Sequence, residues 1–385
     1  MGTSGATATH GTPATPVNQA PVVASINPDA APSATEEFKD GNAATPEMVP
    51  PPKVLQPLPH IALILPLGSK TFGKVADAVK QGFLAGASAD GKNAAPFRVY
   101  TADDDTVSLA TQYRKATADG AMAIVGGVTR DGANIMVKES GYLPSLALNA
   151  PVDAGPNDRD LPDRFFYVSL NLDWEARLAA RTATNDGLRR VAVVTAGTPL
   201  AKRVQDSFEK EWIRLGGEIA ARLVVSGDLS EGPRIAATME KATADVAFLA
   251  AEMKVARAAR PFLPAGMPVF STSMTIDPRA DAVENLDLES VRFMEMPWFV
   301  QPDHPAVMAY SKPAEAMPID YERLYALGID AWRLAQLVAR TDSPKNALSL
   351  DGVTGRITLE GHQFVRMLAS GEMRDGRSTL FKPVE

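Results

Sequence analysis

The sequence predicts an α/β fold of two lobes, each a doubly wound parallel sheet covered by helices on both faces. Short, continuous apolar runs at 121–125 and 144–148 alternate with amphipathic segments at 109–119 and 131–140. Strands can lack polar alternation when both of their faces are buried, as in parallel sheets. The same order of strands and helices begins again after residue 168. In such folds ligands bind at the carboxyl ends of the strands, so the pattern also indicates where a functional site should lie.

The first unit begins at Pro59 with the apolar strand 60–65. Paired glycines, Gly126 and Gly127, end its third strand, and Asn149 ends the fourth. We expect its strands at 60–65, 97–100, 121–125, 144–148 and 165–168, and its helices at 73–88, 109–119 and 131–140.

The second unit resembles the first. Asp173 is well placed to cap its opening helix, because an aspartate there accepts hydrogen bonds from the first free N–H groups. Two similar units in succession suggest duplication and a cleft between two lobes, which is a preferred place for a ligand. We expect helices at 174–186, 201–215, 233–242 and 253–260, and strands at 190–195, 219–225 and 246–250.

Composition limits the possible functions. The chain has 385 residues with 45% hydrophobic content, enough for one large core or two moderate ones. Its formal net charge of -7 and the lack of a basic cluster argue against nucleic acid as a partner. Without cysteine the chain has no disulfide, no thiolate metal site and no cysteine nucleophile, which fits the periplasm and is also allowed in the cytosol.

Residues 1–57 are rich in Ala, Thr and Pro, and Phe38 is their one aromatic residue. Such a segment cannot pack a core, so we expect a disordered tether. The start lacks the basic and apolar lead-in of a signal peptide, and Ala6 does not fit a myristoylation motif. We therefore expect the chain to begin after a removed export segment, and no apolar run reaches the length of a transmembrane segment.

Catalytic and metal-binding patterns are weak. The acidic run 103–105 stands just before a helix, where negative charge is favoured, so capping is a better interpretation than a metal site. The four histidines, His10, His60, His304 and His362, show no H-E-x-x-H spacing. There is also no G-x-S-x-G, P-loop or G-x-G-x-x-G motif. We therefore predict no catalytic residues, no metal and no cofactor.

Small polar residues follow several predicted strands and are the candidates for the cleft between the lobes. Helix capping or turn formation explains each of them at least as well as ligand contact does. The candidates are Ser69, Thr71, Thr129, Asn149, Thr198, Glu252, Ser271 and Ser273.

Two groups of aromatic residues could belong either to the core or to a site. Tyr325, Ile329 and Trp332 recur at four- and three-residue spacing, which favours the core. Trp298, beside a proline, is equally compatible with packing at a hinge and with the wall of the cleft, and we include it among the cleft candidates.

The segments 100–105 and 120–127 resemble the first lobe of type I periplasmic binding proteins, the fold of branched-chain amino acid receptors. Those receptors hold the ligand with small hydroxyl residues after the third and fourth strands. This chain has Val128 and Arg130 at one place and Ala150-Pro151 at the other, which weakens an interpretation as an amino acid receptor.

Three further segments, 291–298, 323–332 and 350–359, resemble in that order the LppC or LpoA family. Members of that family are outer-membrane lipoproteins that activate a class A penicillin-binding protein. The resemblance implies three crossings between the lobes, near Leu170, Met296 and Phe364. The first lobe would then comprise 58–170 and 297–364, and the second 171–296 and 365–385.

The chain departs from the family pattern twice, since the lipid-bearing cysteine and the helical-repeat domain ahead of this module are both missing. From the resemblance we expect a non-enzymatic periplasmic activator with a class A penicillin-binding protein, a peptidoglycan synthase, as partner. Its precursor would be tethered to the inner leaflet of the outer membrane. The alternative is a receptor for a small polar ligand bound in the cleft.

Overall fold

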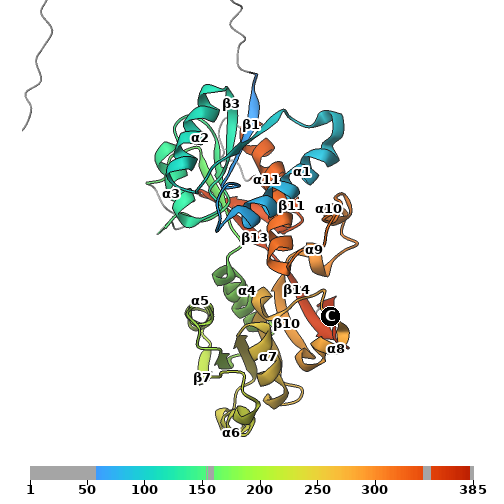
Figure 1. Cartoon of the computed structure of the whole chain (residues 1–385). Coiled ribbons are helices and arrows are strands. Elements are labelled where there is room, and N and C mark those ends of the chain that lie inside the picture. The colour runs from blue at the N-terminus through green and yellow to red at the C-terminus, as the bar shows by residue number, and fades with distance from the viewer. Residues whose placement is uncertain (1–57, 153, 155–159, 341–347, 382–385) are drawn as a thin grey trace, which may run out of the picture. The chain divides into compact units, whose positions relative to one another are not determined.

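The computed structural model describes residues 58–152, 154, 160–340 and 348–381. Residues 1–57, for which composition predicts a tether, lie outside the described residues. Two sheets form the described part, one of eight strands and one of seven, which we call sheet A and sheet B (Figure 1). Among the described residues no helix has both the length and the apolarity needed to span a bilayer.

Sheet A has a parallel core extended at one edge by an antiparallel hairpin. Alternate residues of its first strand face opposite helical layers, because successive side chains of a strand point to opposite faces. Ile61 and Leu63 pack with α1 (Gly73–Asp90) and α11 (Ile319–Arg340), whereas Ala62 and Ile64 pack with α2 (Val107–Ala118) and α3 (Arg130–Glu139). The strands, in spatial order, are β11 (Ser349–Gly352), β12 (Gly355–Glu360), β13 (Gln363–Met367), β5 (Phe165–Val168), β4 (Ser145–Ala147), β3 (Ala121–Gly126), β1 (His60–Leu65) and β2 (Phe97–Thr101).

Sheet B is built in the same way. Helices α4 (Leu172–Asn185) and α5 (Pro199–Arg214) cover one face, and α6 (Gly232–Ala242) and α7 (Met253–Ala259) cover the other. The short helices α8 (Ala282–Asn285), α9 (Pro297–Val300) and α10 (Pro305–Met308) follow. The strands, in spatial order, are β15 (Arg377–Leu380), β14 (Ala369–Arg374), β10 (Val291–Glu295), β9 (Val269–Thr272), β8 (Val246–Ala250), β6 (Arg190–Thr195) and β7 (Glu218–Val224).

The two parallel cores share one topology. In each, the first strand lies between the second and the third, and the fourth and fifth follow in order. This arrangement confirms the prediction of two doubly wound sheets. In each sheet the strand order reverses beside the first strand, between β1 and β3 in sheet A and between β6 and β8 in sheet B. Ligands bind beyond the carboxyl ends of the strands at such a point.

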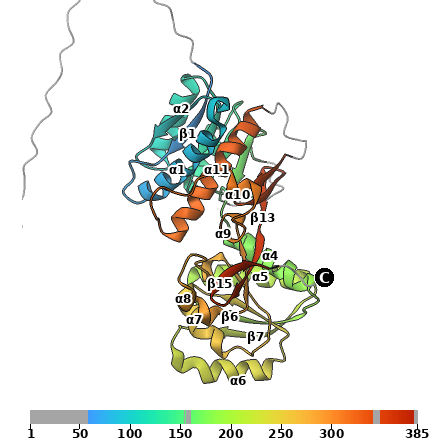
Figure 2. The ribbon, with the colours of Figure 1, turned by 90° about the vertical axis from the view of Figure 1, so that its right-hand side faces the viewer.

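The chain passes between the sheets three times. It leaves sheet A after Val168, returns after Glu295 to form α11, and leaves again between Met367 and Ala369. At the third passage β13 continues beyond Phe364, since Arg366 and Met367 still pair with β12. Helix α11 lies beside α1, as both views show (Figure 1, Figure 2).

The predicted cap of the first helix in the second lobe is wrong. Asn171, not Asp173, is the capping residue, because its backbone is extended and its side chain accepts the N–H of Asp173 at 2.9 Å. Asp173 lies in the first turn instead, where its carboxylate is 3.0 Å from Nε of Arg203.

Candidate functional site

A cavity of about 630 Å³, which we call the large cavity, lies at the carboxyl ends of the strands of sheet B. One wall comes from the ends of β6, β8, β9 and β10, and the opposite wall comes from the first turns of α11 and the first passage between the sheets. Both walls are mainly apolar, with contributions from Leu170, Leu172, Met253, Met274, Met296 and Leu324.

Buried charged groups lie at the side of the large cavity next to α11. Arg323 donates from Nη2 to Oε2 of Glu295 at 2.6 Å and to the carbonyl oxygen of Ser273 at 3.0 Å. The N–H of Ser273 donates to Oε2 of Glu175 at 2.8 Å. Since Arg323 comes from α11 and the other residues from the second lobe, these contacts tie the two lobes together. Arg366, also buried, lies in β13 just before the third passage between the sheets. It donates to the carbonyl oxygen of Ser169, at the first passage, and to that of Thr354, so it connects the first passage with the third.

Burial controls the charge state of these groups. It raises the pKa of Glu175 to about 7, and the negative charge of Glu295 adds to this effect, although the N–H of Ser273 opposes it. Burial is the largest single influence on Arg323 and lowers its pKa, but the carboxylates of Glu295, Glu175 and Asp320 together outweigh burial and raise the pKa. The large cavity is therefore bordered by a carboxyl group that changes protonation near neutral pH.

The structure brings two of the predicted cleft residues of sheet B to this cavity. Glu252 and Ser273 both line it, and Glu252 accepts a hydrogen bond from the hydroxyl of Thr198 at 3.0 Å. Thr198 also caps α5 by accepting the N–H of Ala201. Ser271 lies in the interior of the sheet instead, where its hydroxyl donates to the carbonyl oxygen of Leu249.

The predicted residues of sheet A do not line the large cavity. Ser69 accepts the N–H groups of Thr71 and Phe72 and so stabilises the turn before α1, and Thr71 is exposed. Thr129 caps α3 by accepting the N–H of Gly132. Asn149 lines a separate cavity of about 160 Å³, the small cavity, between the carboxyl edge of sheet A and α5.

The acidic run before α2 has two roles. Asp104 accepts the N–H groups of Thr106 and Ser108, as expected of a capping residue. Asp105 is buried, and it accepts both the N–H and the hydroxyl of Thr129 at the start of α3. Burial raises the pKa of Asp105 to about 6 despite these hydrogen bonds. The chain's own carboxylate thus occupies the amino end of α3.

Trp298 is buried and packs at the second passage between the lobes. Its Nε1 donates to Glu322 at 2.9 Å, its ring lies 5.7 Å from that of Tyr325, and Nζ of Lys312 lies 3.6 Å from its ring centre. These contacts join α9 to α11. Tyr325, Ile329 and Trp332 are buried, which confirms their assignment to the core.

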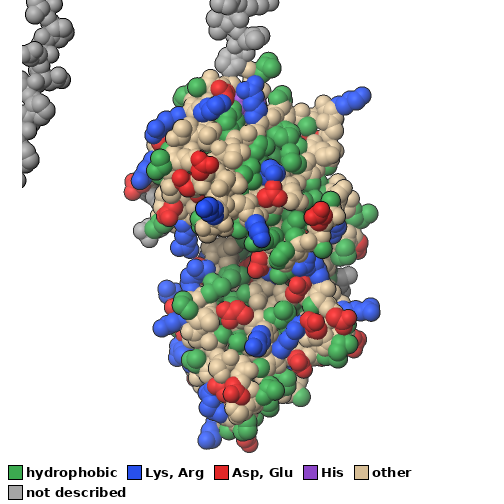
Figure 3. Space-filling view, in the orientation of Figure 1, with side chains coloured by type: hydrophobic (Ala, Val, Ile, Leu, Met, Phe, Trp, Pro, Cys, Tyr) green, Lys and Arg blue, Asp and Glu red, His purple; other side chains and the backbone are tan. Residues whose placement is uncertain are grey.

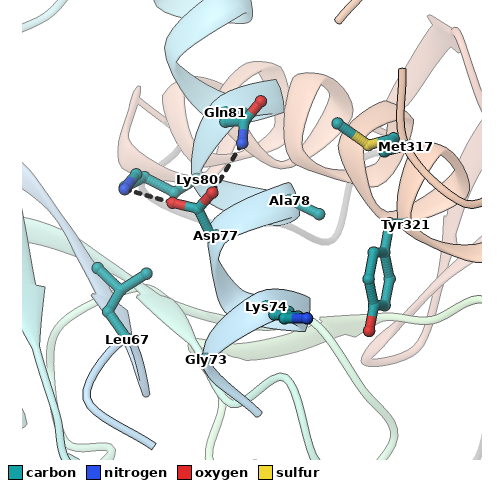
Figure 4. A pocket seen from close by; sticks show the side chains of 9 residues that line it. All are labelled: Leu67, Gly73, Lys74, Asp77, Ala78, Lys80, Gln81, Met317 and Tyr321. Carbon is teal, nitrogen blue, oxygen red and sulfur yellow. Dashed lines mark hydrogen bonds and ion pairs between the residues drawn. The ribbon is translucent and has the colours of Figure 1, made fainter. Parts of the chain in front are cut away.

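Another cavity, of about 480 Å³, lies outside the predicted cleft, between the start of α1 and the start of α11 (Figure 4). Asp77 accepts a hydrogen bond from Gln81 at 2.7 Å and pairs with Lys80, so its carboxylate is already neutralised. Met317, which precedes α11, and Tyr321, in the first turn of α11, line the same cavity. In the described ranges no three His, Cys, Asp or Glu residues gather as a metal site would require.

Sequence reasoning missed the buried charged groups that join the lobes. Glu295 and Arg323 belong to segments that resemble the LppC or LpoA family, but periodicity predicts only that those segments are a strand and a helix. Burial of a charged side chain depends on partners far away in the sequence, which local patterns do not reveal.

Comparisons with known proteins agree with this architecture. A family model described as "LppC putative lipoprotein" matches residues 53–375. The penicillin-binding protein activator LpoA of Klebsiella pneumoniae is 24% identical over 301 residues, which cover 69% of this chain and 41% of that protein. The chain spans less than half the length of the curated relatives it matches.

Two solved structures share the fold. One, from Chromobacterium violaceum and named a putative branched-chain amino acid ABC transporter, is 32% identical with a TM-score of 0.70, covering 82% of this chain and 99% of that one. The other is the C-domain of LpoA from Haemophilus influenzae, named a regulator of PBP1A. It is 20% identical with a TM-score of 0.66, covering 84% of this chain and all of that one. The family model covers most of the chain and the fold agrees with it, so this protein belongs to the LppC family.

Proposed function

We propose that this chain is a non-enzymatic activator of a class A penicillin-binding protein and acts on peptidoglycan synthesis in the periplasm. The observation that carries the proposal is the match to the LppC family along residues 53–375. Curated relatives that match this chain are named penicillin-binding protein activators. A tether to the outer membrane is part of the same proposal.

The contacts between the lobes support an activator over a receptor. A receptor that closes around its ligand needs lobes that can separate, whereas here α11 is bonded to the second lobe through Arg323, Glu295 and Ser273. Breaking a buried ion pair is costly because it leaves a charge without a partner. Lobes held in this way would present a fixed surface to a protein partner.

An activator that catalyses no reaction itself must bind one conformation of the synthase more tightly than another. If the chain binds an active conformation of the synthase better than an inactive one, it shifts the population toward the active form. A tenfold change in rate needs only about 1.4 kcal/mol of such preference, which a modest surface can supply.

The test is a synthase assay with the full chain. We expect the purified chain alone to leave peptidoglycan precursors unchanged, and to raise the glycan-polymerising or cross-linking rate of its cognate synthase in a saturable way. A heat-denatured sample of the chain is the control. An unchanged rate at saturating chain would contradict the proposal.

A receptor for a small polar ligand is the second candidate, favoured by the 32% identity to the protein named a putative branched-chain amino acid ABC transporter. Tight binding of a small metabolite, seen as a rise in melting temperature, together with an unchanged synthase rate would support it.

A further inference from the structure

The small cavity combines basic groups from both lobes. It has a volume of about 160 Å³ and is lined by Arg130, Asn149, Ser169, Asn171 and Arg203, among others. Arg130 begins α3 in the first lobe, and Arg203 lies on α5 in the second. Lys and Arg side chains gather along the side of the molecule where α3 and α5 lie (Figure 3).

The two guanidinium groups are poorly neutralised. Arg203 uses Nε to contact Asp173 at 3.0 Å, and Nη1 and Nη2 make no other ion pair in the described part of the chain. Arg130 has neither a hydrogen bond nor an ion pair with any residue that the structure describes. Asp131, its neighbour in sequence, is exposed and forms no ion pair with it there. Two positive groups therefore line one cavity, with one carboxylate bonded to one of them.

The remaining polar groups of the small cavity favour a ligand that accepts hydrogen bonds. Both amide atoms of Asn149 are already used, since Nδ2 donates to the carbonyl of Val128 and Oδ1 accepts the N–H of Ala150. These two hydrogen bonds hold the Asn149 side chain in a fixed position at the wall of the cavity. The 14-residue helix α4 begins at the cavity behind its cap Asn171, and the amino end of a helix attracts negative charge. The first turn of α4 already carries two acids, Asp173, which contacts Arg203, and Glu175, which accepts the N–H of Ser273. The unpaired donors are therefore those of the arginines.

We propose that the small cavity binds a phosphate group, held between Arg130 of one lobe and Arg203 of the other. Guanidinium groups present paired N–H donors that match the oxygens of phosphate, and such charge-assisted hydrogen bonds are stronger than neutral ones. The volume is below the several hundred Å³ typical of sites for drug-sized ligands, so the cavity suits a compact group. The phosphate is either the free ion or the end of a phosphomonoester that extends into solvent. This site goes beyond the proposed function and does not depend on it.

Calorimetric titration of the full chain tests the proposal. One arm uses inorganic phosphate, a second uses glycerol phosphate, and a third uses sodium chloride at matched ionic strength. We expect saturable binding of phosphate and none in the chloride arm. Tighter binding of glycerol phosphate than of free phosphate would identify a phosphomonoester as the source, and the reverse would identify the free ion.

Substitution locates the site. Arg130→Gln should weaken binding about tenfold or more, because it removes charge-assisted hydrogen bonds to the phosphate. Since no described residue bonds to Arg130, its replacement should not unfold the chain. Arg203→Gln should weaken binding similarly, and Lys202→Gln, which removes the same charge from an exposed neighbour outside the cavity, should not. No saturable binding in the parent, or equal affinity in the Arg130 and Lys202 variants, would overturn the proposal.

Discussion

At the scale of single residues, the most unusual feature is a set of charged side chains buried where the lobes meet. Glu175, Glu295, Arg323 and Arg366 are all nearly inaccessible to solvent. A buried charge is expensive unless it is paired and hydrogen-bonded. Arg323 pairs with Glu295, whereas Glu175 receives the N–H of Ser273 and has no arginine in direct contact among the described residues. Burial without a cation in contact therefore favours the protonated form of Glu175 and raises its pKa.

We predict that Glu175→Gln changes how stability depends on pH. The pKa of Glu175 is about 7 in the folded chain against an ordinary 4.5, so the folded chain binds the proton more tightly than the unfolded chain does. The free energy of unfolding should then fall as pH rises from about 4.5 to about 7, by up to about 3 kcal/mol from this group. Glutamine mimics the protonated acid and should remove that decline, so the variant should be more stable than the parent at pH 8.

Urea unfolding at pH 5 and pH 8 measures this effect. Asp105, whose pKa is about 6, gives a smaller decline of the same sign, which the variant should retain. Glu252→Gln, on the opposite wall of the large cavity, is the matched control. Parallel pH profiles for the parent and Glu175→Gln would contradict the assignment.

Trp298 should contribute strongly to stability. It is buried, packs against Tyr325 and donates to Glu322, so Trp298→Ala should cost about 3 to 5 kcal/mol. Trp298→Phe keeps an aromatic ring at this position and loses only the hydrogen bond and part of the packing, so it should lower the free energy of unfolding by less than the alanine change does. Denaturant midpoints of both variants provide the measurement, and an alanine variant as stable as the parent would show that this packing is unimportant.

At the scale of elements, α1 and α11 pack closely through two glycines. A Cβ atom on Gly82 would lie 1.8 Å from the carbonyl oxygen of Tyr325, and one on Gly328 would lie 2.2 Å from that of Val79. Each glycine therefore contacts the backbone of the opposite helix. Neither contact can be relieved by rotating a side chain.

We predict that Gly82→Ala and Gly328→Ala each destabilise the chain. In an isolated helix the same change would stabilise by about 1 kcal/mol. Here the new methyl group must push two backbones apart, and overpacking of this kind costs about 1–3 kcal/mol or more. Gly141→Ala, where a Cβ meets nothing within 4 Å, is the control. Thermal unfolding should show lower midpoints for the two helix variants only.

The elements were largely predictable from sequence, whereas their partners were not. Apolar runs such as 60–65 and 246–250 form the expected strands because burial on both faces leaves a local signature. Asp173 was misassigned because Asn171, two residues earlier, is an equally good capping residue and local sequence does not choose between them. Nothing near α11 in the sequence indicates that it packs beside α1, because that choice depends on the whole topology.

For the predicted cleft, the sequence indicates which loops lie there but not the direction in which each side chain points. Ser271 and Ser273 are two residues apart, yet Ser271 bonds to β8 inside the sheet while Ser273 lines the large cavity. The difference arises because Ser271 still belongs to β9 and Ser273 begins the turn after it. Arg323 and Glu295 escaped prediction because they become partners only when the chain returns from the second lobe to the first.

At the scale of the described fold, α11 acts as a link between the lobes. It packs on sheet A, but its first turns bond to the second lobe at two places. Arg323 contacts Glu295 and the loop after β9, and Arg279 from that same region donates to Glu322 at 2.6 Å. Movement of one lobe against the other would have to break these contacts together, so they should restrain the cleft.

Arg323→Met tests this restraint. Removing the arginine leaves Glu295 buried without its cation, which should cost about 3–5 kcal/mol. The double variant Arg323→Met with Glu295→Met removes both charges and should be more stable than the Arg323 variant alone, so the two effects should not add. Hydrogen exchange should meanwhile accelerate in both the loop 273–276 and the first turns of α11 in the single variant, because the lobes lose a shared contact. Purely additive free energies of unfolding, with exchange unchanged in the loop, would mean that the pair does not hold the lobes together.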